Sequence, residues 1–139
     1  MDGKQKTVRR WLLEMWGGGK LELVDELASP DYVYHAPGAG AGEVKGRKAL
    51  KQLVTYFRTV FPDLSNTIED QFVSGDRVAT RGITRGTQKG AMGNVAPTGR
   101  KVAINWIMIS RFEGKTIRED YEVWDGLVLL QDLGAYPRP

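Results

Sequence analysis

The chain has 139 residues, a length that fits one domain able to bury about two-thirds of the surface its unfolded form exposes. Hydrophobic residues make up 41% and charged residues 27% of the sequence, which is the balance of a globular protein and excludes a disordered or fibrous one. The net charge is +3, but the basic stretch 77–101 contains no aromatic residue, so we expect no nucleic-acid partner, because such partners are usually bound by basic stripes interleaved with stacking groups.

Three amphipathic segments predict helices in the first half of the chain. The first carries apolar residues at helical spacing until the glycines at 17–19 end it: Val8, Trp11, Leu12, Met15 and Trp16. A short helix is predicted over 21–28, with a break at Ser29-Pro30-Asp31. The third helix begins at Gly46 or Arg47 and is closed by Pro62.

Extended segments and tight turns dominate the second half. Four strands are predicted over 67–74, 77–89, 101–112 and 116–124, and a terminal helix over 125–133 with Asp125 as its N-cap. A brief extended piece at 32–35 precedes a Pro/Gly loop at 37–42. Helices followed by antiparallel strands indicate an α+β fold. We expect a strongly curved sheet, covered by about three N-terminal helices, that encloses an apolar pocket.

Several kinds of site are excluded by residues that the sequence lacks. Cysteine is absent and histidine occurs once, at His35, so disulfides and a thiol nucleophile are excluded and we expect no metal site. No apolar run approaches the roughly 18 residues of a membrane span, and the N-terminus is charged and amphipathic, unlike a signal peptide. We therefore expect a cytoplasmic protein with no membrane partner.

Several different short motifs follow one another along nearly the whole chain. They are Val8-Arg9-Arg10, Pro30-Asp31-Tyr32 followed by His35, Phe61-Pro62-Asp63-Leu64, Gly75-Asp76-Arg77-Val78 with Arg81, Pro97-Thr98-Gly99-Arg100, Phe112-Glu113-Gly114-Lys115, and the closing runs 119–125 and 129–134. Their order and spacing resemble the SnoaL-like polyketide cyclases, cone-shaped α+β domains of the nuclear-transport-factor-2-like superfamily. The resemblance implies a single domain over 1–139, an apolar cavity for a small organic molecule, and a homodimer.

The resemblance also implies a reaction. The cyclases close a ring by intramolecular aldol condensation, in which a carboxylate takes a proton from an acidic carbon without a metal or an organic cofactor. By motif alignment, Glu122 holds the place of the family's acting aspartate in the last strand. Asp120 replaces a histidine that many relatives have, and Trp106 and Met108 stand at two polar pocket positions of the preceding strand. These departures concern the reaction and leave the fold assignment intact.

Strand alternation gives an independent check on these positions, because alternate residues of a strand face one side. Two sets share a face: Val102, Ile104, Trp106 and Met108, and Arg118, Asp120, Glu122 and Trp124. If the Trp106 face lines the cavity, both carboxylates lie against an apolar wall, which raises their pKa and makes each a better base. Two carboxylates this close would also lose their protons at different pH values. In the alternative, they lie exposed and pair with Arg118 or Lys115.

Further residues complete the expected site. His35 lies between Tyr34 and a Pro/Gly loop, at the expected rim of the cup, where it would exchange protons near neutral pH; the alternative is a structural histidine bonded to a carbonyl. Tyr34, Phe57 and Trp124 join Trp106 and Met108 as the expected substrate-binding residues.

The sequence as a whole predicts a cofactor-independent cyclase or isomerase that acts on an apolar, carbonyl-bearing, polyketide-like molecule. Glu122 would move the proton, and Asp120 or His35 would assist. The alternatives are a non-catalytic ligand-binding or dimerisation domain on the same fold, and a hydroxylase-like or ketosteroid-isomerase-like relative. A buried Glu122 that faces a cavity would favour catalysis, whereas one that pairs outward in solvent would contradict it.

Overall fold

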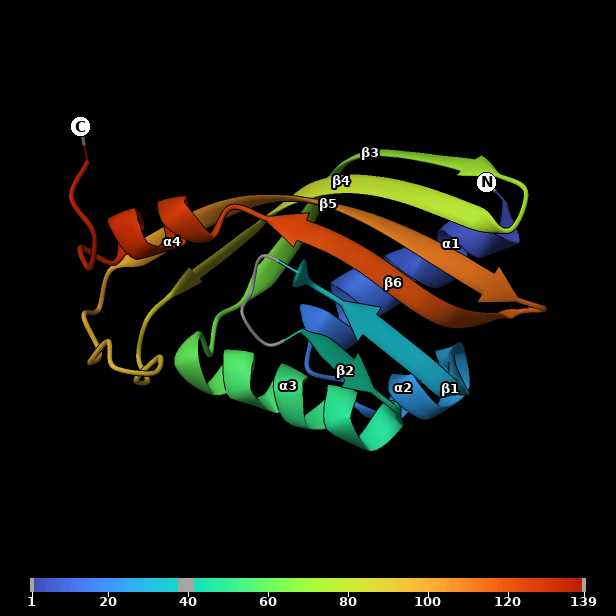
Figure 1. Ribbon diagram of the computed structural model, residues 1–139, viewed down its shortest axis with the longest axis horizontal. Helices are drawn as coiled ribbons and strands as arrows, with labels where there is room; N and C mark the ends of the chain where they lie inside the picture. The colour runs from blue at the N-terminus through green and yellow to red at the C-terminus, as the bar shows by residue number, and fades with distance from the viewer. Residues whose placement is uncertain (1, 38–41, 139) are drawn as a thin grey trace.

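The computed structural model describes residues 2–37 and 42–138, and a six-stranded sheet forms its centre (Figure 1). The strands are β1 (Ala28–His35), β2 (Glu43–Lys45), β3 (Ser65–Ser74), β4 (Arg77–Thr87), β5 (Lys101–Glu113) and β6 (Thr116–Trp124), in the order β2-β1-β6-β5-β4-β3. Neighbouring strands are antiparallel except β1 and β6, which are parallel. The sheet is open, with β2 and β3 at its edges.

The helices are α1 (Gly3–Arg10), which continues into the π-helical turn η1 (Trp11–Trp16), then α2 (Glu22–Leu27), α3 (Arg47–Val60) and α4 (Gly126–Asp132). Figure 1 shows α1, α2 and α3 on one side of the curved sheet, with α4 beyond the end of β6. The predicted α+β class and the curved sheet covered by N-terminal helices are confirmed. None of the helices in the described part of the chain is long and apolar enough to cross a membrane.

The first helix is fixed at both ends. Asp2 forms a capping box with Gln5 at its start, which satisfies amide groups that have no partner within the helix. At its end, the amide of Gly17 donates to the carbonyl of Leu12 (3.1 Å), five residues earlier, and Arg58 donates to the Gly17 carbonyl (3.0 Å). Such a π turn is frequent at functional sites, and here it brings the first helix against both the core and the cavity.

The core consists of two clusters of buried side chains. The larger lies beneath β1 and β6 and includes Trp11, Tyr32 and Met108. The smaller lies at the α4 end and includes Phe61 and Leu129, with the remaining members Val60, Leu64, Val102, Ile104 and Leu133. Trp124 packs against both clusters. The end of β6 therefore lies at the junction of the two.

The region between helices α2 and α3 differs from the prediction in two respects. Helix α2 ends at Leu27, before Ser29-Pro30-Asp31, as predicted, but β1 begins at Ala28 and runs through that segment instead of starting at Tyr32, with a register shift against β6 between Ala28 and Val33. A proline is tolerated at such an irregularity because the amide it lacks is not needed there. The short edge strand β2 has only three residues and leaves no alternating pattern by which to predict it.

Candidate active site

A cavity of about 90 Å³ lies on the helix side of the sheet, where the two core clusters meet. Its walls are mostly apolar, and η1, α3 and the inner face of the sheet contribute to them. The lining includes Trp16, Tyr34, Phe57, Trp106, Glu122 and Trp124. Four of the five predicted substrate-binding residues therefore reach one cavity. The fifth, Met108, packs in the larger core cluster at 1% exposure and is not part of this lining.

Among the described residues that line this cavity, Glu122 is the one carboxylate. It is half-buried. The Tyr34 hydroxyl donates to its Oε1 atom. Burial raises the pKa of Glu122 to about 7, the bond from Tyr34 opposes that rise, and the charge of Asp120 adds to it. At neutral pH this carboxyl group therefore readily exchanges a proton.

Asp120 lies on the same face of β6 but deeper, at 0% exposure. Its Oδ2 atom accepts hydrogen bonds from the Tyr32 hydroxyl (2.7 Å) and from Trp11 Nε1 (3.1 Å). Burial raises the pKa of Asp120 to about 6, against the opposing effect of Ser110, Tyr32 and Trp11. The Ser110 hydroxyl and Asp120 Oδ1 are both buried without a partner at bonding geometry, although the two residues face each other in the strand register.

Two tyrosines of β1 thus each hold one carboxylate of β6. Because Tyr32 and Tyr34 are two residues apart, as are Asp120 and Glu122, the pairs repeat with the period of the strands. Burial, followed by the charge of the facing carboxylate, raises the pKa of both phenols well above its ordinary value. Both hydroxyls therefore stay protonated and donate. The alternative of exposed carboxylates that pair with Arg118 is contradicted, since Arg118 contacts the Asp31 carbonyl and Glu113 instead.

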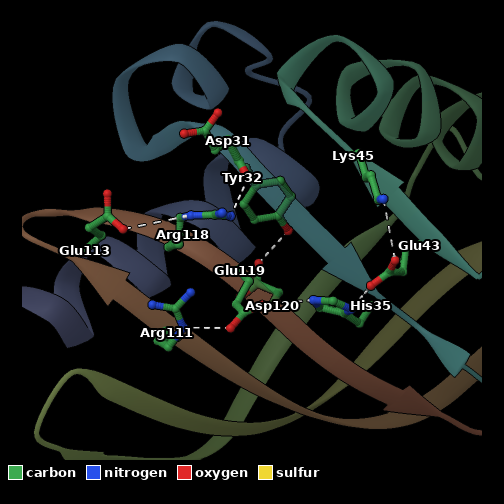
Figure 2. A network of polar contacts seen from close by, with 10 residues as sticks. All are labelled: Asp31, Tyr32, His35, Glu43, Lys45, Arg111, Glu113, Arg118, Glu119 and Asp120. Atoms are coloured by element: carbon green, nitrogen blue, oxygen red, sulfur yellow. Dashed lines mark hydrogen bonds and ion pairs between the residues drawn. The ribbon is translucent and has the colours of Figure 1, made fainter.

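His35 is not brought to the cavity, contrary to expectation, because alternation on β1 turns Tyr34 inward and His35 to the opposite face. Its Nδ1 lies 2.8 Å from Glu43 and its Nε2 3.0 Å from Glu119, while Glu119 also pairs with Arg111 (2.6 Å), as Figure 2 shows. Its ring stacks on Tyr121, with 4.1 Å between centroids. The interactions of this ring fasten β2 and β6 to β1, which is a structural role.

Asn66 and Thr84 are polar lining residues that the sequence analysis did not identify. The Thr84 hydroxyl donates to Asn66 Oδ1 (2.5 Å), and Asn66 Nδ2 donates to the Leu12 carbonyl (2.9 Å). The two residues belong to no motif, and only their facing positions on β3 and β4 indicate that they meet. Among the described residues, no group of three or more His, Asp or Glu side chains is placed to hold a metal ion.

Comparisons with known proteins identify the family and the fold. The family model for SnoaL-like polyketide cyclases matches residues 6–133. IdmH from Streptomyces antibioticus, a proposed polyketide cyclase, is 30% identical with a TM-score of 0.83, over 94% of this chain and 98% of that one. AclR from Streptomyces galilaeus, a proposed hydroxylase, is 25% identical with a TM-score of 0.84, over 97% of this chain and 87% of that one.

A proposed SnoaL-like polyketide cyclase from Jannaschia sp. CCS1 has a TM-score of 0.87 at 23% identity, over 97% of this chain and 94% of that one, and so supports the fold. No curated protein matches the sequence. The family match begins within α1 and spans all the strands and the other helices described above. The chain therefore belongs to the SnoaL-like polyketide cyclase family.

Proposed function

We propose that the protein is an enzyme that moves a proton on an apolar, carbonyl-bearing molecule of polyketide type, in an aldol-type cyclisation or an isomerisation that needs no cofactor. One observation carries the proposal: Glu122 faces an apolar cavity with a pKa of about 7. A base works best when its pKa lies near the working pH, and a desolvated carboxylate in an apolar wall meets that condition.

The proposed step uses both oxygens of Glu122. Oε1 accepts the Tyr34 hydroxyl, which fixes the carboxylate plane and leaves Oε2 for the substrate. Oε2 takes a proton from the carbon next to a carbonyl, and the electron pair of that C–H bond forms an enolate. In a cyclisation the enolate carbon attacks a second carbonyl of the same molecule, and the protonated Glu122 then gives its proton to the alkoxide oxygen that this attack forms. In an isomerisation Glu122 returns the proton to another carbon of the conjugated enolate. Either way the carboxylate is regenerated. Tyr34 keeps its own proton throughout because its pKa is raised.

Asp120 has a different proposed role from Glu122. It lies outside the cavity lining and is saturated on one side by Tyr32 and Trp11. Its charge raises the pKa of Glu122, so it acts on the substrate only through its neighbour. We therefore assign Asp120 as a positioning residue and leave His35, which lies on the other face of the sheet, out of the proposed site.

The experiment is deuterium exchange into aryl ketones in D₂O, followed by proton NMR, alongside turnover on a panel of carbonyl compounds. Glu122→Gln keeps the shape of the side chain but removes the base, and we expect both rates to fall at least about 100-fold. Glu119→Gln is the matched control, since it makes the same change on the same strand at the opposite face. Exchange that survives Glu122→Gln within a few-fold would contradict the mechanism and favour a non-catalytic ligand-binding domain.

A homodimer is part of the proposal. Exposed apolar side chains gather on the face of the sheet that turns away from the helices: Phe72, Ile107, Ile109, Tyr121 and Val123. They are neighbours in the register, with Ile107 opposite Val123 and Ile109 opposite Tyr121. We propose that a second copy of the chain covers this face, which we call the outer apolar face.

A further inference from the structure

A second cavity, of about 340 Å³, adjoins the first. Three aromatic residues line both: Tyr34, Phe57 and Trp124. The second cavity, here the outer chamber, also has walls of its own just after β1, on β2, on α3 and in the loop between β4 and β5, namely Ala36, Val44, Leu53, Tyr56 and Met92. The first cavity, here the inner chamber, holds Glu122. The two chambers are therefore separated by a partition of three side chains.

The sizes of the two chambers differ in a way that limits what each can hold. Sites for small organic ligands usually measure about 300–1,000 Å³. The inner chamber, at about 90 Å³, falls well below that range, whereas the outer chamber, at about 340 Å³, falls within it. A molecule larger than a single small ring that places a carbonyl group beside Glu122 therefore extends beyond the inner chamber, and the outer chamber adjoins it.

The walls of the outer chamber fit an uncharged, apolar group. None of the described residues that line it is acidic or basic. The polar side chains that line it are two tyrosines and Trp124, and both phenols are engaged: the Tyr56 oxygen accepts from the Gly93 amide (3.1 Å), and the Tyr34 hydroxyl donates to Glu122. Burial of an apolar group there releases water without leaving a charge unpaired.

The three residues of the partition are held in different ways. Tyr34 is held by its hydrogen bond to Glu122. Phe57 touches aromatic rings on both sides, with centroids 5.3 Å from Tyr56 and 6.5 Å from Trp16. Trp124 is the last residue of β6 and is only partly buried. The boundary between the two chambers is thus built from three aromatic rings.

We propose that the outer chamber is a second binding subsite, which takes the distal part of an elongated, uncharged, apolar substrate whose carbonyl end lies beside Glu122. This inference rests on the proposed function for the position of the carbonyl. It adds the substrate class: a molecule longer than the inner chamber can hold, with no charged group on its distal part.

Aryl ketones of increasing chain length test the inference, with acetophenone, butyrophenone and octanophenone as probes and calorimetry as the measurement. Affinity should rise with chain length by up to about fourfold for each methylene that becomes buried. Leu53→Trp fills the outer chamber from α3 without touching the inner lining. It should remove the gain for octanophenone and leave acetophenone binding unchanged. Met92→Trp provides the same block from the loop if Leu53→Trp fails to fold.

Leu127→Trp is the matched control, because Leu127 is exposed on α4 and lines neither chamber. Equal affinity for all three ketones, or an equal loss for short and long ketones in both blocking variants, would overturn the subsite. Deuterium exchange into acetophenone reports on Glu122 separately. Exchange with no dependence on chain length would overturn this inference alone, whereas dependence on chain length without exchange would overturn only the proposed chemistry.

Discussion

At the scale of single residues, the molecule separates two carboxylates that share one face of one strand. Asp120 is fully buried and Glu122 half-buried, and desolvation is the largest cause of the raised pKa in each. Glu122 opens to the cavity, whereas Asp120 is enclosed by Tyr32 and Trp11. Two carboxyl groups this close lose their protons as a coupled pair, so the pKa values of about 6 and about 7 describe the pair. Glu122 is the member that can meet a substrate, because it opens to the cavity.

The raised pKa of Glu122 predicts how the stability of the fold depends on pH. The folded pKa of about 7 exceeds the ordinary value of 4.5, so the folded state binds more protons than the unfolded state between these values. Stability must then fall as pH rises from about 4.5 to about 7. A shift of this size corresponds to roughly 3 kcal/mol. Urea unfolding of wild type and Glu122→Gln at pH 5 and pH 8 should show the variant stabilised relative to wild type at pH 8, by more than at pH 5.

Glu119 supplies a control of opposite sign on the same strand. Its pKa is lowered, chiefly by the bond from Arg111, so the stability that it contributes is present above the unfolded pKa and is lost as pH falls through the folded pKa. Glu119→Gln should therefore lower stability at pH 8. A Glu122→Gln variant whose stability relative to wild type is the same at pH 5 and pH 8 would contradict the assigned burial of Glu122.

At the scale of strands, Gly82 of β4 decides how the floor of the inner chamber is built. It lies opposite Trp106 in the register, and a Cβ atom at this position would lie 2.4 Å from Trp106 Cζ2 and 2.5 Å from the Thr67 carbonyl oxygen. Since Thr67 contributes backbone, it has little freedom to move aside. The glycine thus allows the indole of Trp106 to lie flat against β4, and the floor of the cavity depends on this close approach.

Gly82→Ala should therefore destabilise the fold by about 1–3 kcal/mol, the usual cost of overpacking, and weaken acetophenone binding because Trp106 is pushed into the inner chamber. Urea unfolding and calorimetry measure the two effects. Gly3→Ala is the control, since no atom lies within 4 Å of its added Cβ, and it should leave binding unchanged. Wild-type stability and wild-type acetophenone binding in Gly82→Ala would contradict the close packing of Trp106 against β4.

The strands also show which features the sequence predicts and which it does not. The pattern predicts β6 with its observed bounds, and alternation puts Asp120 and Glu122 on one face of it, because a strand has a strict period of two. That this face is also the Trp106 face follows only from the register between β5 and β6. His35 does not reach the cavity, because Tyr34 beside it points inward and alternation turns His35 outward. The contact between Asn66 and Thr84 and the close approach at Gly82 depend on register across strands, which no local pattern encodes.

At the scale of the whole molecule, the two faces of the sheet differ in kind. The helix side holds both core clusters and both chambers. The other side carries the outer apolar face, on which Val123 is 65% and Phe72 62% exposed. Large apolar patches on a protein surface usually mark an interaction site, and a two-fold axis allows a single patch to cover itself. The polar network of His35, Glu43 and Glu119 borders this face through Tyr121.

If two copies of the chain bury the outer apolar face against each other, a charge placed on that face should prevent dimerisation. Ile107 lies between Arg81 of β4 and Val123 of β6 in the register, so Ile107→Glu places a carboxylate among side chains that would be desolvated in the dimer. Analytical ultracentrifugation should find wild type as a dimer and Ile107→Glu as a monomer, whereas Leu127→Glu, which alters exposed α4, should remain a dimer. A monomeric wild type, or a dimer unaffected by Ile107→Glu, would contradict the interface. Because both chambers lie on the helix side of the sheet, the monomeric variant should still bind octanophenone more tightly than acetophenone, which separates assembly from ligand binding.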